Sequence, residues 1–186
     1  MPKPLNITEP STDTGGMATI TYGDASAIGE NTLTSVSVSV YTKEHNGVTV
    51  SKGTVTVGAW TESPDGGATY ADATTDLGVL GADRVSIKTK NESGGDDNSY
   101  YDISIMKFKA KDLTHDSDEM MVKQMTHDKY DSSDHSIDLH LEGNVAISAF
   151  DALASGTDTL VAVDAYALAI EDQLSLSTVM ITSAVG

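Results

Sequence analysis

The chain has 186 residues, with 28 acidic against 11 basic side chains for a net charge of -17, and it has no cysteine. Such acidity argues against binding to nucleic acids or to anionic membranes, because both would repel it. The lack of cysteine excludes disulfides and thiolate metal sites. No apolar run is long enough to predict a transmembrane helix, and the first residues do not resemble a secretion signal.

The first sixteen residues are rich in proline. Pro2, Pro4 and Pro10 fall there, followed by serine, threonine and glycine. Proline fixes φ and removes a backbone donor, so residues 1–16 are predicted to form an extended arm, and residues 17–186 a single domain. Isolated arms of this kind fray, so we expect a neighbouring subunit to hold this one in place.

Strand patterns then dominate. Residues 35–40 alternate serine and valine, which is typical of a strand with one buried face. Asn46-Gly47 suits a tight hairpin turn, and the alternation resumes over residues 48–57. From about Glu62 to Gly81, the many glycine, aspartate and alanine residues predict a loop.

A second hairpin is expected further along, with strands at residues 85–87 and 101–105 and a polar tip over residues 91–98. Later candidate strands are the alternating segments at residues 137–141 and 145–147 and the more apolar segments at residues 160–163, 165–170 and 174–181.

The segment from Ser117 to Met125 is open to two interpretations. Ser117 followed by two acidic residues could cap a helix, and the same residues could also alternate along a strand.

Eight to ten short strands joined by Gly, Asn and Asp turns predict an all-β fold. The expected architecture is an antiparallel β-sandwich of jelly-roll or Greek-key type, with a thin core of valine, isoleucine and alanine.

Local signatures of catalysis are missing from the sequence. It contains no Gly-x-Ser-x-Gly elbow, no phosphate-binding glycine loop and no His-Glu-x-x-His motif. Histidines interleaved with aspartates could bind a divalent metal or seat a general base, but a solvated acidic face is the favoured interpretation. The histidines in question are His115, His127, His135 and His140, with His45 apart from them. We therefore predict no enzyme, no catalytic or metal-ligating residues and no cofactor.

Two ligand-binding alternatives remain. Calcium needs several oxygen ligands, and acidic residues cluster at 92–98 and 116–119, although neither cluster has the EF-hand order. Aromatic rings could stack on sugars, but packing is the favoured role for them. The rings are those of Trp60, Tyr22, Tyr41, Tyr70, Tyr100, Tyr101, Tyr130, Tyr166, Phe108 and Phe150.

The last quarter of the chain resembles the capsid decoration (cement) proteins of tailed phages. The resemblance lies in turn and strand patterns at residues 143–147, 154–159 and 167–175. It implies a β-sandwich on the outer surface of an icosahedral capsid, made in the host cytoplasm and bridging neighbouring capsid subunits. It also implies the major capsid protein and further copies of the chain, as a trimer or dimer, as partners. No catalytic residue and no small-molecule substrate is implied.

Two other functions are kept open. A self-assembling tail-tube or surface-layer subunit would polymerise without a separate scaffold. A glycan- or calcium-binding module would use the same sandwich without any assembly.

Overall fold

The computed structural model describes residues 16–113, 122–126 and 142–186, with only the backbone described for residues 122–126. Its ten strands form two five-stranded sheets. The first has the order β7-β4-β1-β10-β9, with bounds Val122–Thr126, Tyr70–Leu80, Met17–Ile28, Leu174–Val185 and Thr159–Ile170. The second has the order β5-β6-β3-β2-β8, with bounds Arg84–Gly95, Ser99–Asp112, Val48–Glu62, Asn31–His45 and Asn144–Ser155.

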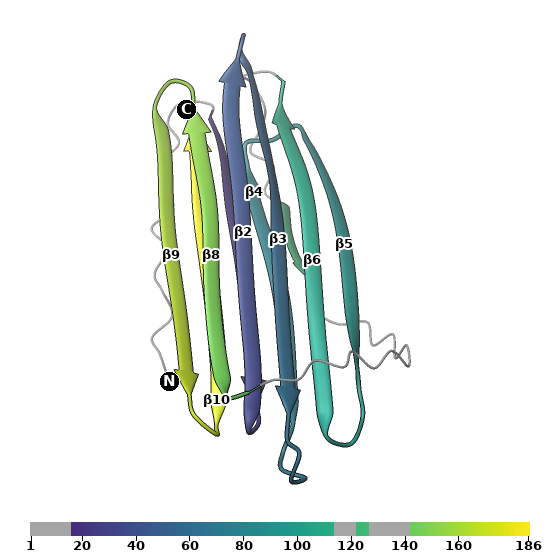
Figure 1. Cartoon of the computed structure of the whole chain (residues 1–186). Helices are drawn as coiled ribbons and strands as arrows, with labels where there is room; N and C mark the ends of the chain where they lie inside the picture. Colours follow the sequence, from purple (N-terminus) through teal and green to yellow (C-terminus); the bar gives the residue numbers. More distant parts are fainter. Residues whose placement is uncertain (1–15, 114–121, 127–141) are drawn as a thin grey trace.

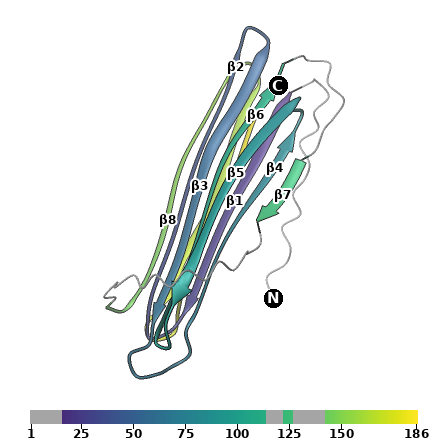
Figure 2. The same cartoon turned by 90° about the vertical axis from the view of Figure 1, so that its right-hand side faces the viewer.

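The two sheets pack face to face as an elongated sandwich, which confirms the all-β prediction (Figures 1 and 2). The described residues contain no helix. Of the segment from Ser117 to Met125, for which helix and strand were both considered, the part from Val122 on belongs to the strand Val122–Thr126. We refer to the sheets by their central strands, as the β1 sheet and the β3 sheet.

One strand pair departs from the antiparallel expectation. β8 pairs with β2 in parallel, with Val38 opposite Phe150, so the β3 sheet is mixed. Parallel neighbours need a long connection, because a tight turn can join only antiparallel strands. Here the chain leaves β2 at His45 and returns to it at Asn144.

Period-two burial explains why these residues form strands. Along β2 the valines at 36, 38 and 40 are buried, while the serines between them lie on the outer face. Asn46 and Gly47 both have positive φ, of 53° and 71°, which is the geometry of the predicted hairpin turn between β2 and β3.

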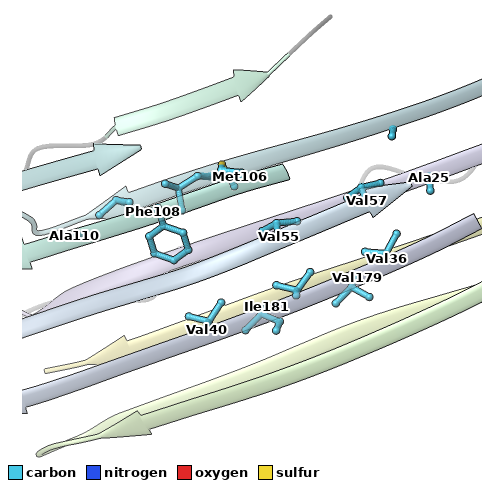
Figure 3. Close-up of a cluster of buried hydrophobic side chains, with 14 of the residues drawn as sticks. Ala25, Val36, Val40, Val55, Val57, Met106, Phe108, Ala110, Val179 and Ile181 are labelled. Atoms are coloured by element: carbon cyan, nitrogen blue, oxygen red, sulfur yellow. The ribbon is translucent and has the colours of Figure 1, made fainter. Parts of the chain in front are cut away.

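The core between the sheets is a thin apolar layer. Val36, Val55 and Val57 of the β3 sheet meet Val179 and Ile181 of the β1 sheet (Figure 3). Each is fully buried, and burying a side chain of this size is worth about 1.5 to 3 kcal/mol. This layer matches the predicted core of valine, isoleucine and alanine.

Buried hydroxyl groups also join the two sheets, which the sequence patterns did not reveal. Ser183 Oγ of β10 donates to Thr42 Oγ1 of β2 at 2.8 Å, and Thr42 Oγ1 donates to Ser51 Oγ of β3 at 2.9 Å. Thr19 Oγ1 of β1 lies 3.1 Å from Ser51 Oγ. Because paired hydroxyls lose little on burial, serine and threonine can occupy core positions here.

The prediction of a loop from Glu62 to Gly81 is wrong over most of its length, since Tyr70–Leu80 is the strand β4. Its inward positions are small or apolar and alternate without a break, namely Ala71, Ala73, Thr75, Leu77 and Val79. Alanine and threonine made this alternation weak in the sequence.

Three other predictions fall on parts of the chain that the structure does not describe. These are the extended arm, apart from Gly16, the capped start of a helix at Ser117, and the strand at residues 137–141.

Candidate functional site

β8 and β9 form one long flank of the sandwich. They are consecutive in the chain, yet they are edge strands of different sheets: among the described strands, β8 pairs only with β2, and β9 only with β10. A short turn that includes Asp158, with a φ of 46°, connects them. The hairpin therefore passes from one sheet to the other, and its two strands lie together at the left of Figure 1. We call this surface the β8–β9 flank.

Most of the exposed large apolar side chains of the described residues lie on this flank. Nine of the twelve belong to β8 or β9, with exposed fractions between 38% and 55%. They are Val145, Ile147, Phe150, Leu153, Leu160, Val161, Val163, Tyr166 and Ile170. Exposed apolar residues scattered singly need no explanation, but a contiguous set marks an interaction surface.

The flank is apolar on both faces of its strands. Phe150 lies opposite Val38, a buried residue, so it points into the layer between the sheets, yet it is 55% exposed. Val163 lies opposite the buried Ile181 and is 38% exposed. Ala165 and Ala167, on the same face of β9 as Val163, are also exposed.

Among residues 16–113, 122–126 and 142–186, no strand pairs with the outer edge of β8 or of β9. An edge strand presents a row of unpaired N–H and C=O groups, and proteins usually protect such edges with lysine, proline or a covering segment. From Glu142 to Gly186 the sequence contains neither lysine, arginine nor proline. One local bond is present: Ser148 Oγ donates to the carbonyl oxygen of Tyr166 at 2.8 Å and ties the two strands together.

Every charge on the flank is negative. Asp151 lies on the outer face of β8, Asp164 on the outer face of β9, and Asp158 at the turn. At that turn the carboxylate of Glu44 accepts a hydrogen bond from the backbone N–H of Thr157 at 3.3 Å. The flank is thus an apolar strip bordered by carboxylates alone, which suits a partner with apolar and basic groups.

The candidate metal residues are only partly described. His45 ends β2 and is exposed, while His115, His127, His135 and His140 lie outside the described residues. Across residues 16–113 and 142–186, no group of three or more histidine or acidic side chains is arranged to hold a metal ion.

The acidic loop at residues 92–98 is built as a turn. The carboxylate of Asp96 accepts hydrogen bonds from the backbone N–H groups of Asn98 and Ser99, at 2.9 and 2.8 Å. It also accepts one from Ser99 Oγ at 2.9 Å, and these donors lower the pKa of Asp96. The carboxylate therefore serves the hairpin that joins β5 to β6. The second acidic cluster, at residues 116–119, lies outside the described residues.

Of the aromatic candidates for sugar stacking, Tyr130 lies outside the described residues, and six of the other nine are buried or half-buried. Trp60 lies over Gly58, and Tyr101 lies over Gly94 and is only 3% exposed. Burial raises the pKa of the Tyr101 phenol. Phe150 and Tyr166 are the exposed rings of the β8–β9 flank, and Tyr70 is exposed on β4.

The sequence patterns pointed to an arm as the gripping element and missed the flank. A run such as residues 160–163, apolar on both faces, usually predicts a strand buried in the middle of a sheet. The sequence feature that could have revealed the flank is that this apolar run is followed by further alanines, which are too small to fill a core.

Comparisons with family models, with curated proteins and with solved structures give no match for this chain. None of the described residues forms a helix that is long and apolar enough to cross a membrane.

Proposed function

We propose that this chain is a non-enzymatic structural protein of a virion, which decorates the outside of an icosahedral capsid and stabilises it by bridging neighbouring capsid subunits. The observation that carries the proposal is the β8–β9 flank, where nine large apolar side chains lie beside two strand edges that pair with no other described strand. An edge of this kind promotes aggregation unless another protein covers it. A permanent shell partner would provide that cover.

The chemistry of the flank favours a shell protein over a second copy at the same surface. A two-fold interface places the same patch of both copies face to face. Here it would bring Asp151 and Asp164 of each copy together, with no lysine or arginine in either hairpin. A different protein, with apolar residues and a basic border, avoids that repulsion.

Two kinds of contact would hold the shell partner. Extended segments of the partner can add main-chain hydrogen bonds along the free edges of β8 and β9. Phe150 and Tyr166 would supply the aromatic anchors that dominate many interfaces. The segments that resemble decoration proteins include the start of β8, its turn into β9, and the end of β9.

Particles purified from the native source provide the test. Cryo-electron microscopy should show the sandwich on the outer surface of an icosahedral shell, with the β8–β9 flank buried against shell subunits. Particles stripped of the chain should then rebind it in a sedimentation assay.

A matched pair of variants makes this assay specific. Ile147 on the flank and Ile28 on β1 are 48% and 47% exposed, so serine at either should leave folding unchanged. Ile147→Ser should weaken binding to stripped particles roughly tenfold, and Ile28→Ser should bind as the unmodified chain does. Equal binding by both variants, or particles without the sandwich on their surface, would contradict the proposal.

A further inference from the structure

One end of the β3 sheet carries a dense group of basic side chains on its outer face. It lies where β3 and β5 begin and β6 ends, on three strands that are side by side in Figure 1. The strand register places six of the chain's eleven basic residues there, and we call them the basic block. They are Lys52, Arg84, Lys88, Lys107, Lys109 and Lys111. All are exposed except Lys111, which is half-buried.

Like charges face one another across these strands. Lys109 lies opposite Lys52 of β3, and the other four residues form two further pairs between β6 and β5. Such pairs destabilise a sheet. The ion pair of this outer face joins Lys90 to Glu92 at 2.9 Å, outside the block, and no block residue forms an ion pair with a described residue. The repulsion within the block is therefore retained.

Protection of the sheet edge accounts for only part of the block. Basic residues on an edge strand discourage another chain from pairing with it, which suits the two block residues of β5. The other four lie on β3 and β6, and each of these strands has a described strand on both sides. Their positions therefore do nothing for an edge, and an external anion would relieve their repulsion.

The acidic groups around the block are directed elsewhere. Asp83 accepts a hydrogen bond from the backbone N–H of Leu113 at 2.6 Å, and Asp112 is buried on the inner face of β6. On the outer face, Glu92 is held in its ion pair, and Asp151 lies on β8, which β2 separates from β3. The field over the block is therefore positive, although the whole chain carries a net charge of -17.

We propose that the basic block binds an anionic polysaccharide, a chain of sugars that carries sulfate or carboxylate groups at intervals. Alternate residues of a strand are about 7 Å apart and neighbouring strands about 4.8 Å apart, so the block is a grid of separated positive charges. Five of its six residues are lysines, and the ammonium group of lysine is a compact point charge. Anionic groups spread along a sugar chain can meet such charges one by one.

Nucleic acid fits the block less well. Duplex DNA carries one negative charge per about 1.7 Å of its axis, and it would extend from the block over the rest of an acidic chain. Single strands are bound by stacking bases on exposed aromatic rings. The ring beside the block is that of Tyr41 on β2, and Nζ of Lys52 already lies over it, 5.3 Å from its centroid.

Fluorescence anisotropy with two labelled polymers tests the full chain. Heparin carries sulfate groups and polygalacturonate carries carboxylates, so binding of one alone would support the inference and identify the anionic group. Binding should be strong at low salt and lost at 1 M salt, where the screening length is about 3 Å. Neutral dextran should not bind.

Two double variants that remove the same charge make the test specific. Lys107→Gln with Lys109→Gln should weaken binding at least about tenfold, because both residues lie in the middle of the block. Lys43→Gln with Lys90→Gln removes two charges from the same face outside the block, and it should change binding less than about twofold. Thermal denaturation should show that the block variant is at least as stable as the unmodified chain, since it relieves two like-charge pairs.

This inference does not rest on the proposed attachment to a capsid, since the block shares no residue with the β8–β9 flank. Ile147→Ser should bind the polysaccharide as the unmodified chain does, and the block variant should rebind stripped particles normally. A failure of either proposal is therefore distinguishable from a failure of the other.

The inference would be overturned if the unmodified chain bound neither polymer at low salt, or if both double variants weakened binding equally. Tighter binding to DNA than to either polysaccharide would reassign the block to nucleic acid. Tighter binding to vesicles that contain anionic lipids would reassign it to a membrane surface.

Discussion

At the scale of single residues, hydroxyl groups inside the sandwich determine how its two sheets meet. Ser51 is fully buried and interacts with the hydroxyls of both Thr42 and Thr19. Ser175 is equally buried, but within the described residues its hydroxyl has no hydrogen-bond partner. The two serines thus separate the effect of a hydrogen bond from the effect of burial.

Ser51→Ala should lower the free energy of unfolding by about 1 to 3 kcal/mol, because two buried hydroxyls lose a partner. Ser175→Ala should be neutral or slightly stabilising, since it removes a buried polar group that makes no bond. Urea denaturation monitored by circular dichroism measures both. Equal losses in the two variants would contradict a bonding role for Ser51.

Tyr22 gives a prediction about pH. Burial, with a further contribution from Asp24, raises its pKa from 10.0 to about 12. The folded state thus holds the phenol proton more tightly than the unfolded chain does. The resulting stabilisation is complete below pH 10 and is lost as the pH rises from about 10 to about 12.

The ultraviolet absorbance of ionised phenolate measures this. Relative to the native chain, Tyr22→Phe should lack the phenol whose pKa is about 12, and Asp24→Asn should move the titration of that phenol to lower pH. If the phenol missing from Tyr22→Phe titrated at an ordinary pKa, the prediction would be wrong.

At the scale of strands, the spacing between the sheets depends on small residues at chosen positions. Gly23 of β1 faces the valines of the other sheet, and a Cβ atom there would come within 2.8 Å of Val36 and 2.9 Å of Val57. Gly78 of β4 has room, with Ile20 Cβ at 3.8 Å. Neither glycine needs a positive φ, so only the packing differs.

Gly23→Ala should lower the free energy of unfolding by about 1 to 3 kcal/mol through overpacking. Gly78→Ala should be neutral or stabilise by about 0.5 to 1 kcal/mol, because alanine loses less backbone freedom on folding. Thermal denaturation distinguishes them, and a Gly23→Ala variant as stable as Gly78→Ala would contradict the packing argument.

At the scale of the whole molecule, the sequence predicted the class of fold more completely than the surface that could bind a partner. Alternation at residues 35–40 and the Asn46-Gly47 turn identified β2, β3 and their hairpin, because their pattern is local. β4 was missed because alanine and threonine give weak alternation. The parallel pairing of β2 with β8 has no local pattern, since residues about a hundred positions apart make it.

The candidate site could be predicted only in part, for the same reason. The apolar character of residues 145–170 is visible in the sequence, but their exposure depends on which strands lie at the sheet edges. The clustering of lysines on one outer face likewise requires the register of β5, β6 and β3, which is a tertiary property.

The position of β10 has a consequence for synthesis. It follows every other described strand in the chain, yet it lies between β1 and β9, and β1 has no other partner on that side. While the ribosome is still making residues 174–185, the strand that links β1 to β9 is missing from the nascent chain, so the edges that β1 and β9 later pair with β10 are unpaired. Because unpaired edges make nascent chains prone to stick to one another, chaperone protection would matter most in that interval.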